Sequence, residues 1–110
     1  MMGKLSKPSQ ELSARILAEV GFEDRLIGYR LHMRLGAIST SLYSFEEALN
    51  LLCEQYPRMD FALLEKWILE VMGDKELSEK IKAIIKKDTS DQKKTYRIRD
   101  LMAERLAQCK

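Results

Sequence analysis

The fold of this chain depends on how the stretch Leu26–Leu35, LIGYRLHMRL, is interpreted. In its later part every second residue is apolar, namely Tyr29, Leu31, Met33 and Leu35. That period of two is typical of a β-strand. A helix is favoured by the Leu, Met and Arg content, by the acidic pair at 23–24, and by the lack of a partner strand other than the short 95–99. We therefore predict a central helix, apolar on all sides and buried by its neighbours.

A helical pattern precedes this stretch. Ser9 follows a proline and can serve as an N-cap. Apolar residues then recur at every fourth position, at Leu12, Ile16 and Val20. Gly21 is predicted to end this helix in the left-handed conformation that favours glycine.

Four helical patterns follow the stretch, each with a recognisable first turn. Ser44 and Glu47 form a capping box, in which each side chain accepts a hydrogen bond from the backbone N–H of the other. Asp60 can cap the second of these helices. Asp74 can cap the third, directly after Gly73 ends the one before it. A second capping box at 89–92 precedes the last helix.

These patterns predict an all-α fold, a single compact bundle of five or six short helices over residues 9–110, after a flexible N-terminus at residues 1–8. A chain of 110 residues that is 45% hydrophobic suits one domain, and it is long enough to bury a core without disulfides. Cys53 and Cys109 are its only cysteines, and no apolar stretch approaches the ~18 residues of a membrane span. We expect a cytoplasmic protein with reduced thiols and no membrane contact.

The net charge of +2 is the sum of two opposed blocks. Residues 41–79 carry three basic and nine acidic side chains, whereas residues 80–110 carry ten basic and four acidic ones. Opposed blocks are self-complementary between copies, so we predict a non-enzymatic protein-interaction module that forms a homodimer, or binds a protein partner, through an acidic block (46–79) and a basic block (80–110). The alternative is that the basic tail folds onto the acidic middle within one chain.

The basic block also raises nucleic-acid binding as an alternative function. Its cations crowd into the cluster Lys80, Lys82, Lys86, Lys87, Lys93, Lys94, Arg97 and Arg99. Such a cluster neutralises phosphates without reading sequence. The helices around Gly73 suggest a helix-turn-helix, but the outward residues of the second helix include Glu76 and Glu79, which a DNA groove would repel. We therefore rank a nonspecific nucleic-acid-binding accessory protein second.

No metal, cofactor or catalytic site is predicted. The single histidine has no Cys-x-x-Cys or His-Glu-x-x-His spacing around it, and no phosphate-cradling glycine loop occurs. On the predicted central helix, Gly28, His32 and Gly36 would share one face and could form a small cleft with His32 at its floor. The simpler interpretation is a point where two helices cross. We predict that the protein is not an enzyme.

Residues 64–77, LEKWILEVMGDKEL, resemble a pattern in small archaeal and bacterial helical proteins of unknown function. That pattern is an aromatic residue three positions before Trp-Ile, then Val-x-Gly-Asp, a leucine, an apolar residue and a short closing helix. Trp67 and Asp74 carry the match here, Leu64 stands where an aromatic residue is usual, and 98–106 supplies the closing helix. The resemblance implies a helical fold and no assigned activity.

Overall fold

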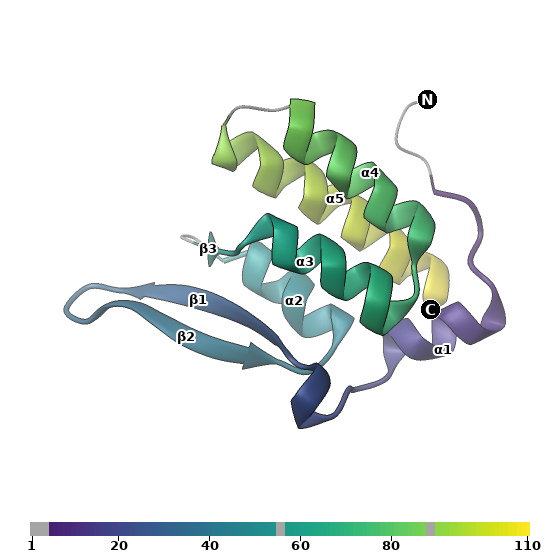
Figure 1. The fold of residues 1–110 in the computed structure, drawn as a ribbon, viewed down its shortest axis with the longest axis horizontal. Coiled ribbons are helices and arrows are strands. Elements are labelled where there is room, and N and C mark those ends of the chain that lie inside the picture. The colour runs from purple at the N-terminus through teal and green to yellow at the C-terminus, as the bar shows by residue number, and fades with distance from the viewer. Residues whose placement is uncertain (1–4, 55–56, 88–89) are drawn as a thin grey trace.

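The computed structural model describes residues 5–54, 57–87 and 90–110. Its elements are α1 (Gln10–Leu17), η1 (Phe22–Asp24), β1 (Leu26–His32), β2 (Gly36–Leu42), α2 (Phe45–Leu52), β3 (Pro57–Arg58), α3 (Phe61–Trp67), η2 (Ile68–Met72), α4 (Lys75–Lys87) and α5 (Asp91–Cys109). The helices gather into one body, and the β1–β2 hairpin projects away from it (Figure 1).

The predicted all-α fold is wrong, because residues 26–32 form β1 and not a central helix. β1 pairs antiparallel with β2, from Leu26 opposite Leu42 to His32 opposite Gly36. The two-residue β3 pairs with the other side of β1, so the strand order is β2-β1-β3 and the protein is α+β. The helix propensities of Leu, Met and Arg are worth only tenths of a kcal/mol per residue, and strand pairing overrides them.

The hairpin is seated on α2 at its base. Leu26 and Leu42 are buried, and Gly28 lies between them and α2. A Cβ added at Gly28 would clash with Leu51 Cδ2 of α2 and would lie 3.2 Å from Leu42 Cδ1. Gly28 is therefore needed for the close approach of strand and helix. At the far end, Gly36 has a φ of +76°, which lets the chain turn back after Leu35.

Helix starts follow the predicted caps more closely than helix ends do. Ser9 accepts a hydrogen bond from the Leu12 N–H, as expected for the N-cap of α1. The predicted role of Gly21 is wrong: α1 ends at Leu17, and Gly21 has an extended backbone with a φ of −74°. The chain leaves the helix early because Val20 donates its N–H to the Tyr43 carbonyl at 2.7 Å.

The later caps confirm the predicted chemistry with one shift. The Ser44 hydroxyl accepts from the Glu47 N–H at 3.1 Å, but the Glu47 carboxylate accepts from Tyr43, one residue before the cap. Asp60 caps α3 as predicted. Ser90 caps α5, whereas Thr89, the first residue of the predicted second box, lies outside the described residues.

Gly73 and Asp74 form the corner between η2 and α4. Gly73 has a φ of +75° and ends the helical segment that begins with α3, as predicted. Asp74 Oδ1 then accepts from the Leu77 N–H, which makes it the cap of α4. The same carboxylate has a second partner in α5, described below.

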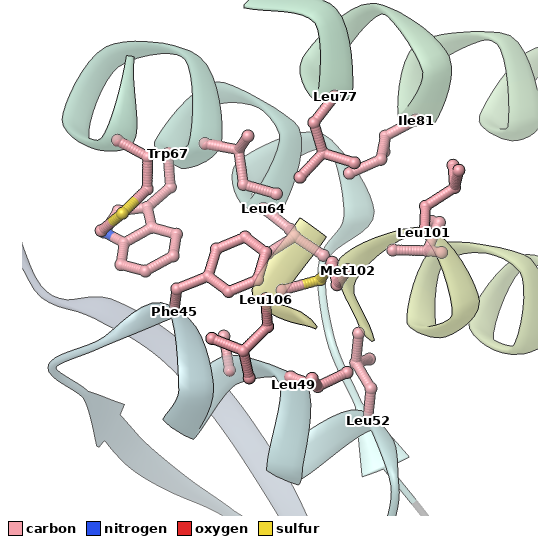
Figure 2. Close-up of a cluster of buried hydrophobic side chains, with 14 of the residues drawn as sticks. Phe45, Leu49, Leu52, Leu64, Trp67, Leu77, Ile81, Leu101, Met102 and Leu106 are labelled. Carbon is pink, nitrogen blue, oxygen red and sulfur yellow. The ribbon is translucent and has the colours of Figure 1, made fainter. Parts of the chain in front are cut away.

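The core lies between α2, α3, α4 and α5 (Figure 2). Its buried side chains include Phe45, Leu49 and Leu52 from α2, Leu64 and Trp67 from α3, Leu77 and Ile81 from α4, and Leu101, Met102 and Leu106 from α5. The Trp67 indole N–H donates to the Asp24 carbonyl at 2.7 Å, which ties the chain before β1 to this core. Within the described ranges, no helix has the length and apolar content needed to cross a membrane.

We expect Gly28→Val to destabilise the protein by about 1–3 kcal/mol, because its side chain would overpack the contact with Leu51. Gly21→Val is the matched control, since its Cβ has nothing within 4 Å and its φ is negative. Urea unfolding of both variants measures the difference. Equal midpoints would show that α2 can move away from β1 without cost.

Candidate functional site

The predicted basic cluster lies on two neighbouring helices, on the second half of α4 from Lys80 and the first half of α5 as far as Arg99 (Figure 1). Three of its members pair with carboxylates. Lys82 Nζ lies 3.4 Å from Glu65, Lys94 Nζ lies 3.9 Å from Asp91, and Arg99 lies 3.7 Å from Asp100. Arg99 also stacks over Tyr96 at 4.7 Å from the ring centroid. The fold therefore neutralises part of the cluster.

Four lysines of the cluster have no carboxylate within ion-pair distance among the described residues: Lys80, Lys86, Lys87 and Lys93. Lys86 and Lys87 occupy the last turn of α4, where the helix dipole favours positive charge. Lys93 and Lys94 follow the N-cap of α5, where the dipole disfavours it. Local helix electrostatics therefore account for the first pair and not for the second.

Most carboxylates of the predicted acidic block have hydrogen-bond or ion-pair partners within the chain. Among the described residues, seven of its nine carboxylates make intrachain contacts, the other two being Glu70 and Glu79. Four of these carboxylates form ion pairs with the basic block: Glu65 with Lys82, Asp74 and Glu76 with Arg105, and Glu46 with Lys110. The basic tail thus folds onto the acidic middle, which was the alternative left open above.

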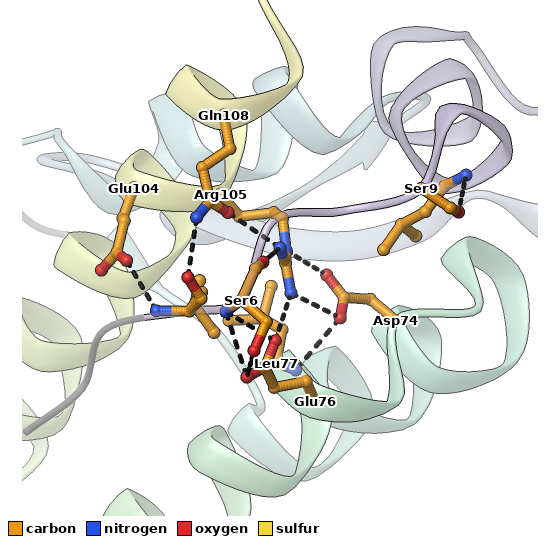
Figure 3. A network of polar contacts seen from close by, with 10 residues as sticks. Ser6, Ser9, Asp74, Glu76, Leu77, Glu104, Arg105 and Gln108 are labelled. Atoms are coloured by element: carbon orange, nitrogen blue, oxygen red, sulfur yellow. Dashed lines mark hydrogen bonds and ion pairs between the residues drawn. The ribbon is translucent and has the colours of Figure 1, made fainter.

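The strongest of these contacts surrounds Arg105 of α5, which is only 1% exposed (Figure 3). Its Nε donates to Asp74 Oδ2 at 2.7 Å, and its Nη2 donates to Asp74 at 3.2 Å and to Glu76 at 3.0 Å. Its Nη1 donates to the Ser6 carbonyl at 2.6 Å and to Gln108 at 2.8 Å. Every N–H group of the guanidinium can therefore be satisfied, as burial of a charge requires.

The same network holds the described part of the N-terminal segment, residues 5–8, which was predicted as part of a flexible N-terminus. Leu5 is buried, and its N–H donates to Glu104 at 2.7 Å. Gln108 donates to the Leu5 carbonyl at 2.8 Å, and Ser6 donates its N–H and hydroxyl to Glu76. The segment lies across α4 and α5 as a strap.

The pKa of Glu76 is shifted by its contacts with Ser6 and Arg105. Partial burial alone would raise the pKa of this carboxyl group, but the hydrogen bonds from Ser6 and the Arg105 guanidinium outweigh that effect. The pKa of Glu76 is therefore below its ordinary value. This direction fits a structural ion pair, since a general acid would need the opposite shift.

The three residues of the predicted cleft do not share a helix face, because the helix on which that prediction rested is absent. Gly28 packs against Leu51 of α2, so its space is filled. His32 pairs with Gly36 at the far end of the hairpin, four residues along the strand from Gly28, a distance of about 13 Å. Within the described residues, no group of three His, Cys, Asp or Glu side chains could hold a metal ion.

The hairpin itself is a surface that the sequence interpretation missed. Its exposed large apolar side chains are Tyr29, Met33, Leu35 and Ile38. No acidic residue occurs from Arg25 to Ser44. Near the middle of β1, Arg30 forms an ion pair with Glu54 at 2.9 Å, which raises the pKa of the guanidinium. From Met33 to Ser39 every residue of the hairpin is exposed, and this part carries Arg34 and the apolar Met33, Leu35 and Ile38.

A comparison with protein families finds no match for this chain, and comparisons with curated proteins and with solved structures find none either. The resemblance at 64–77 therefore stays a prediction. The structure gives its Gly-Asp corner a physical role, since Gly73 ends one helix and Asp74 both caps the next and pairs with Arg105.

We expect Arg105→Met to destabilise the protein by about 3–5 kcal/mol, because it leaves the Asp74 carboxylate buried without its partner. Arg99→Met is the matched control: its ion pair is partly exposed and is worth about 1 kcal/mol or less. Urea unfolding measures both. If the two substitutions cost the same, the buried pair does not hold the structure together.

Proposed function

We propose that this chain is a non-enzymatic protein-interaction module that self-associates, and that the β1–β2 hairpin is its contact surface. The observation that carries the proposal is the exposed apolar surface of a hairpin that projects from the helical body (Figure 1). Met33 is fully exposed and Leu35 is 72% exposed at its tip. Clustered exposed apolar side chains are typical of interaction surfaces.

The physical chemistry of a hairpin supports this choice. An isolated two-stranded hairpin is only marginally stable in water, and it needs a further strand or a packed face to hold its shape. The base of this hairpin has both, through β3 and the seat on α2. β3 reaches along β1 only as far as Arg30, and the end of the hairpin at Met33 has neither support among the described residues, so a partner would stabilise it.

The contact surface proposed here replaces the two charged blocks predicted from the sequence. Most acidic side chains between 46 and 79 already have intrachain partners, so an outside cation would have to displace them. Exchange of one ion pair for another of similar exposure gains little free energy. The hairpin requires no such exchange.

The remaining parts of the proposal concern chemistry and location. Glu76 is the carboxyl group whose pKa is clearly shifted among the described residues, and its shift is that of an ion-paired carboxylate.

Cys53 is exposed and has no disulfide partner. A free, exposed thiol fits a reducing compartment, which supports a cytoplasmic location.

We expect light scattering to find a dimer at micromolar or higher concentration. Met33→Glu should weaken self-association by about tenfold, equivalent to about 1.4 kcal/mol, because it places a charge in an apolar contact. Leu63→Glu is the control, since Leu63 is 50% exposed on α3 and is not part of the hairpin. A monomer at every concentration, or equal weakening by both variants, would contradict the proposal.

A second candidate function is nonspecific binding of nucleic acid by the basic cluster. It is favoured by the lysines at the joined ends of α4 and α5, in particular Lys93, which follows the N-cap of α5 and has no described ion-pair partner. An anionic partner would offset the unfavourable helix dipole at that position. The contacts would be to phosphates and would not read sequence.

Fluorescence anisotropy with a labelled duplex tests this second candidate. We expect the logarithm of the binding constant to fall linearly with the logarithm of the salt concentration, with a slope of about −0.9 per phosphate contacted. The double substitution Lys86→Glu, Lys93→Glu should reduce affinity, whereas Lys66→Glu on exposed α3 surface is the control. Salt-independent binding, or equal loss with the control, would contradict phosphate recognition by this cluster.

A further inference from the structure

The outer edge of β2 is the feature of the hairpin that points to a specific mode of association. β2 is an end strand of the sheet, and no strand in the described part of the chain pairs with its outer edge. Its sequence from Gly36 to Leu42, GAISTSL, contains no charged residue and no proline. Natural sheets protect such edges with lysines, prolines, bulges or a covering segment, because an open edge pairs readily with another strand.

We propose that β2 pairs antiparallel with β2 of a second copy of this chain, with Ser39 on the two-fold axis. The result is one continuous sheet in the order β3-β1-β2-β2-β1-β3. This inference rests on the proposed self-association and specifies the strand, the direction and the register through which it occurs. Such a contact is isologous, so it closes as a dimer and leaves no open β2 edge.

The register follows from strand geometry. Residues opposite each other in an antiparallel pair lie on the same face of the sheet, and both direct their backbone groups either into the pair or away from it. Two identical strands related by a two-fold axis therefore meet at a residue that faces its own copy. Ser39 is the middle residue of β2, so placing it on the axis gives the longest overlap, with Gly36 opposite Leu42.

The charges beyond the two ends of β2 favour this antiparallel contact with a second copy. Before β2 the turn of the hairpin carries Arg34, whereas after β2 come Glu46 and Glu47 in the first turn of α2. Glu19, which forms a backbone bridge to Ser44, adds a third carboxylate at that end. Antiparallel pairing brings the basic end of each copy toward the acidic end of the other, whereas parallel pairing would bring like charges together.

The face that carries Ser39 is compatible with this contact. Ser39 is exposed and lies opposite Tyr29 of β1. In the joined sheet, a Tyr29 ring would flank the axis on each side. No charged side chain of β2 would have to be buried, so the desolvation cost that charged edges carry is absent.

Disulfide cross-linking tests the register directly. In a background with Cys53→Ser and Cys109→Ser, Ser39→Cys places two thiols opposite each other at the axis. Ala37→Cys is the matched control: it lies on the same face and is exposed, but its mate would be about 13 Å away along the strand. Under mild oxidation we expect Ser39→Cys to form covalent dimers on the order of a hundredfold faster than Ala37→Cys, since the millimolar effective concentration of held thiols far exceeds their micromolar solution concentration.

Lysine substitutions at the same positions test the contact without cross-linking. Ser39→Lys sets two like charges opposite each other and should weaken dimerisation by at least about tenfold, whereas Ala37→Lys would face Ser41 of the second copy and should weaken it less. A dimer by light scattering without rapid Ser39→Cys linkage would overturn the edge pairing while leaving self-association intact. A chain that stays monomeric at every concentration would overturn both the edge pairing and the self-association. That outcome includes the case in which the β2 edge binds a strand of a different protein.

Discussion

The buried ion pair between Arg105 and Asp74 is the constraint on which the helical body depends. Removing two charges from water costs several kcal/mol per ion, and only complete hydrogen bonding offsets that cost. The pair therefore requires that α4 begin directly after its cap Asp74, that α5 approach this corner closely, and that the Ser6 carbonyl lie against the guanidinium. One side chain thus fixes two helices and the N-terminal strap relative to each other.

That constraint also changes the meaning of the charge division in the sequence. The acidic residues at 46–79 are used mainly as caps and as internal partners, for example Asp60 on α3 and Glu65 with Lys82. Much of their charge is therefore directed inward and contributes to the fold. Two surfaces are less involved in this internal pairing: the lysine cluster on α4 and α5, which is only partly neutralised, and the hairpin, which carries no acidic residue. These two surfaces are the ones proposed here for function.

Local chemistry explains which features could be predicted. Some features depend only on neighbours within four residues and can therefore be predicted from the sequence. They include the helix caps Ser9 and Asp60 and the left-handed Gly73. The sequence did not predict β1 because no partner strand was identified for it. The signal for that partner is the alternation in β2, where Ser39 and Ser41 separate Ile38, Thr40 and Leu42. Arg105 was missed because basic residues are assigned to solvent by default. Its position four residues after Leu101, on the apolar side of α5, was the available signal.

The two halves of the hairpin are stabilised in different ways. Near the body, Gly28 admits α2 and Arg30 pairs with Glu54, so that half is held by the same dense packing and pairing as the helices. Beyond Arg30, cross-strand pairing alone must offset the loss of chain entropy, which is marginal for two strands. A second copy paired along β2 would supply a further strand to each hairpin without disturbing the Arg105 network. The outer half would then complete its sheet between molecules, as the base completes it within one.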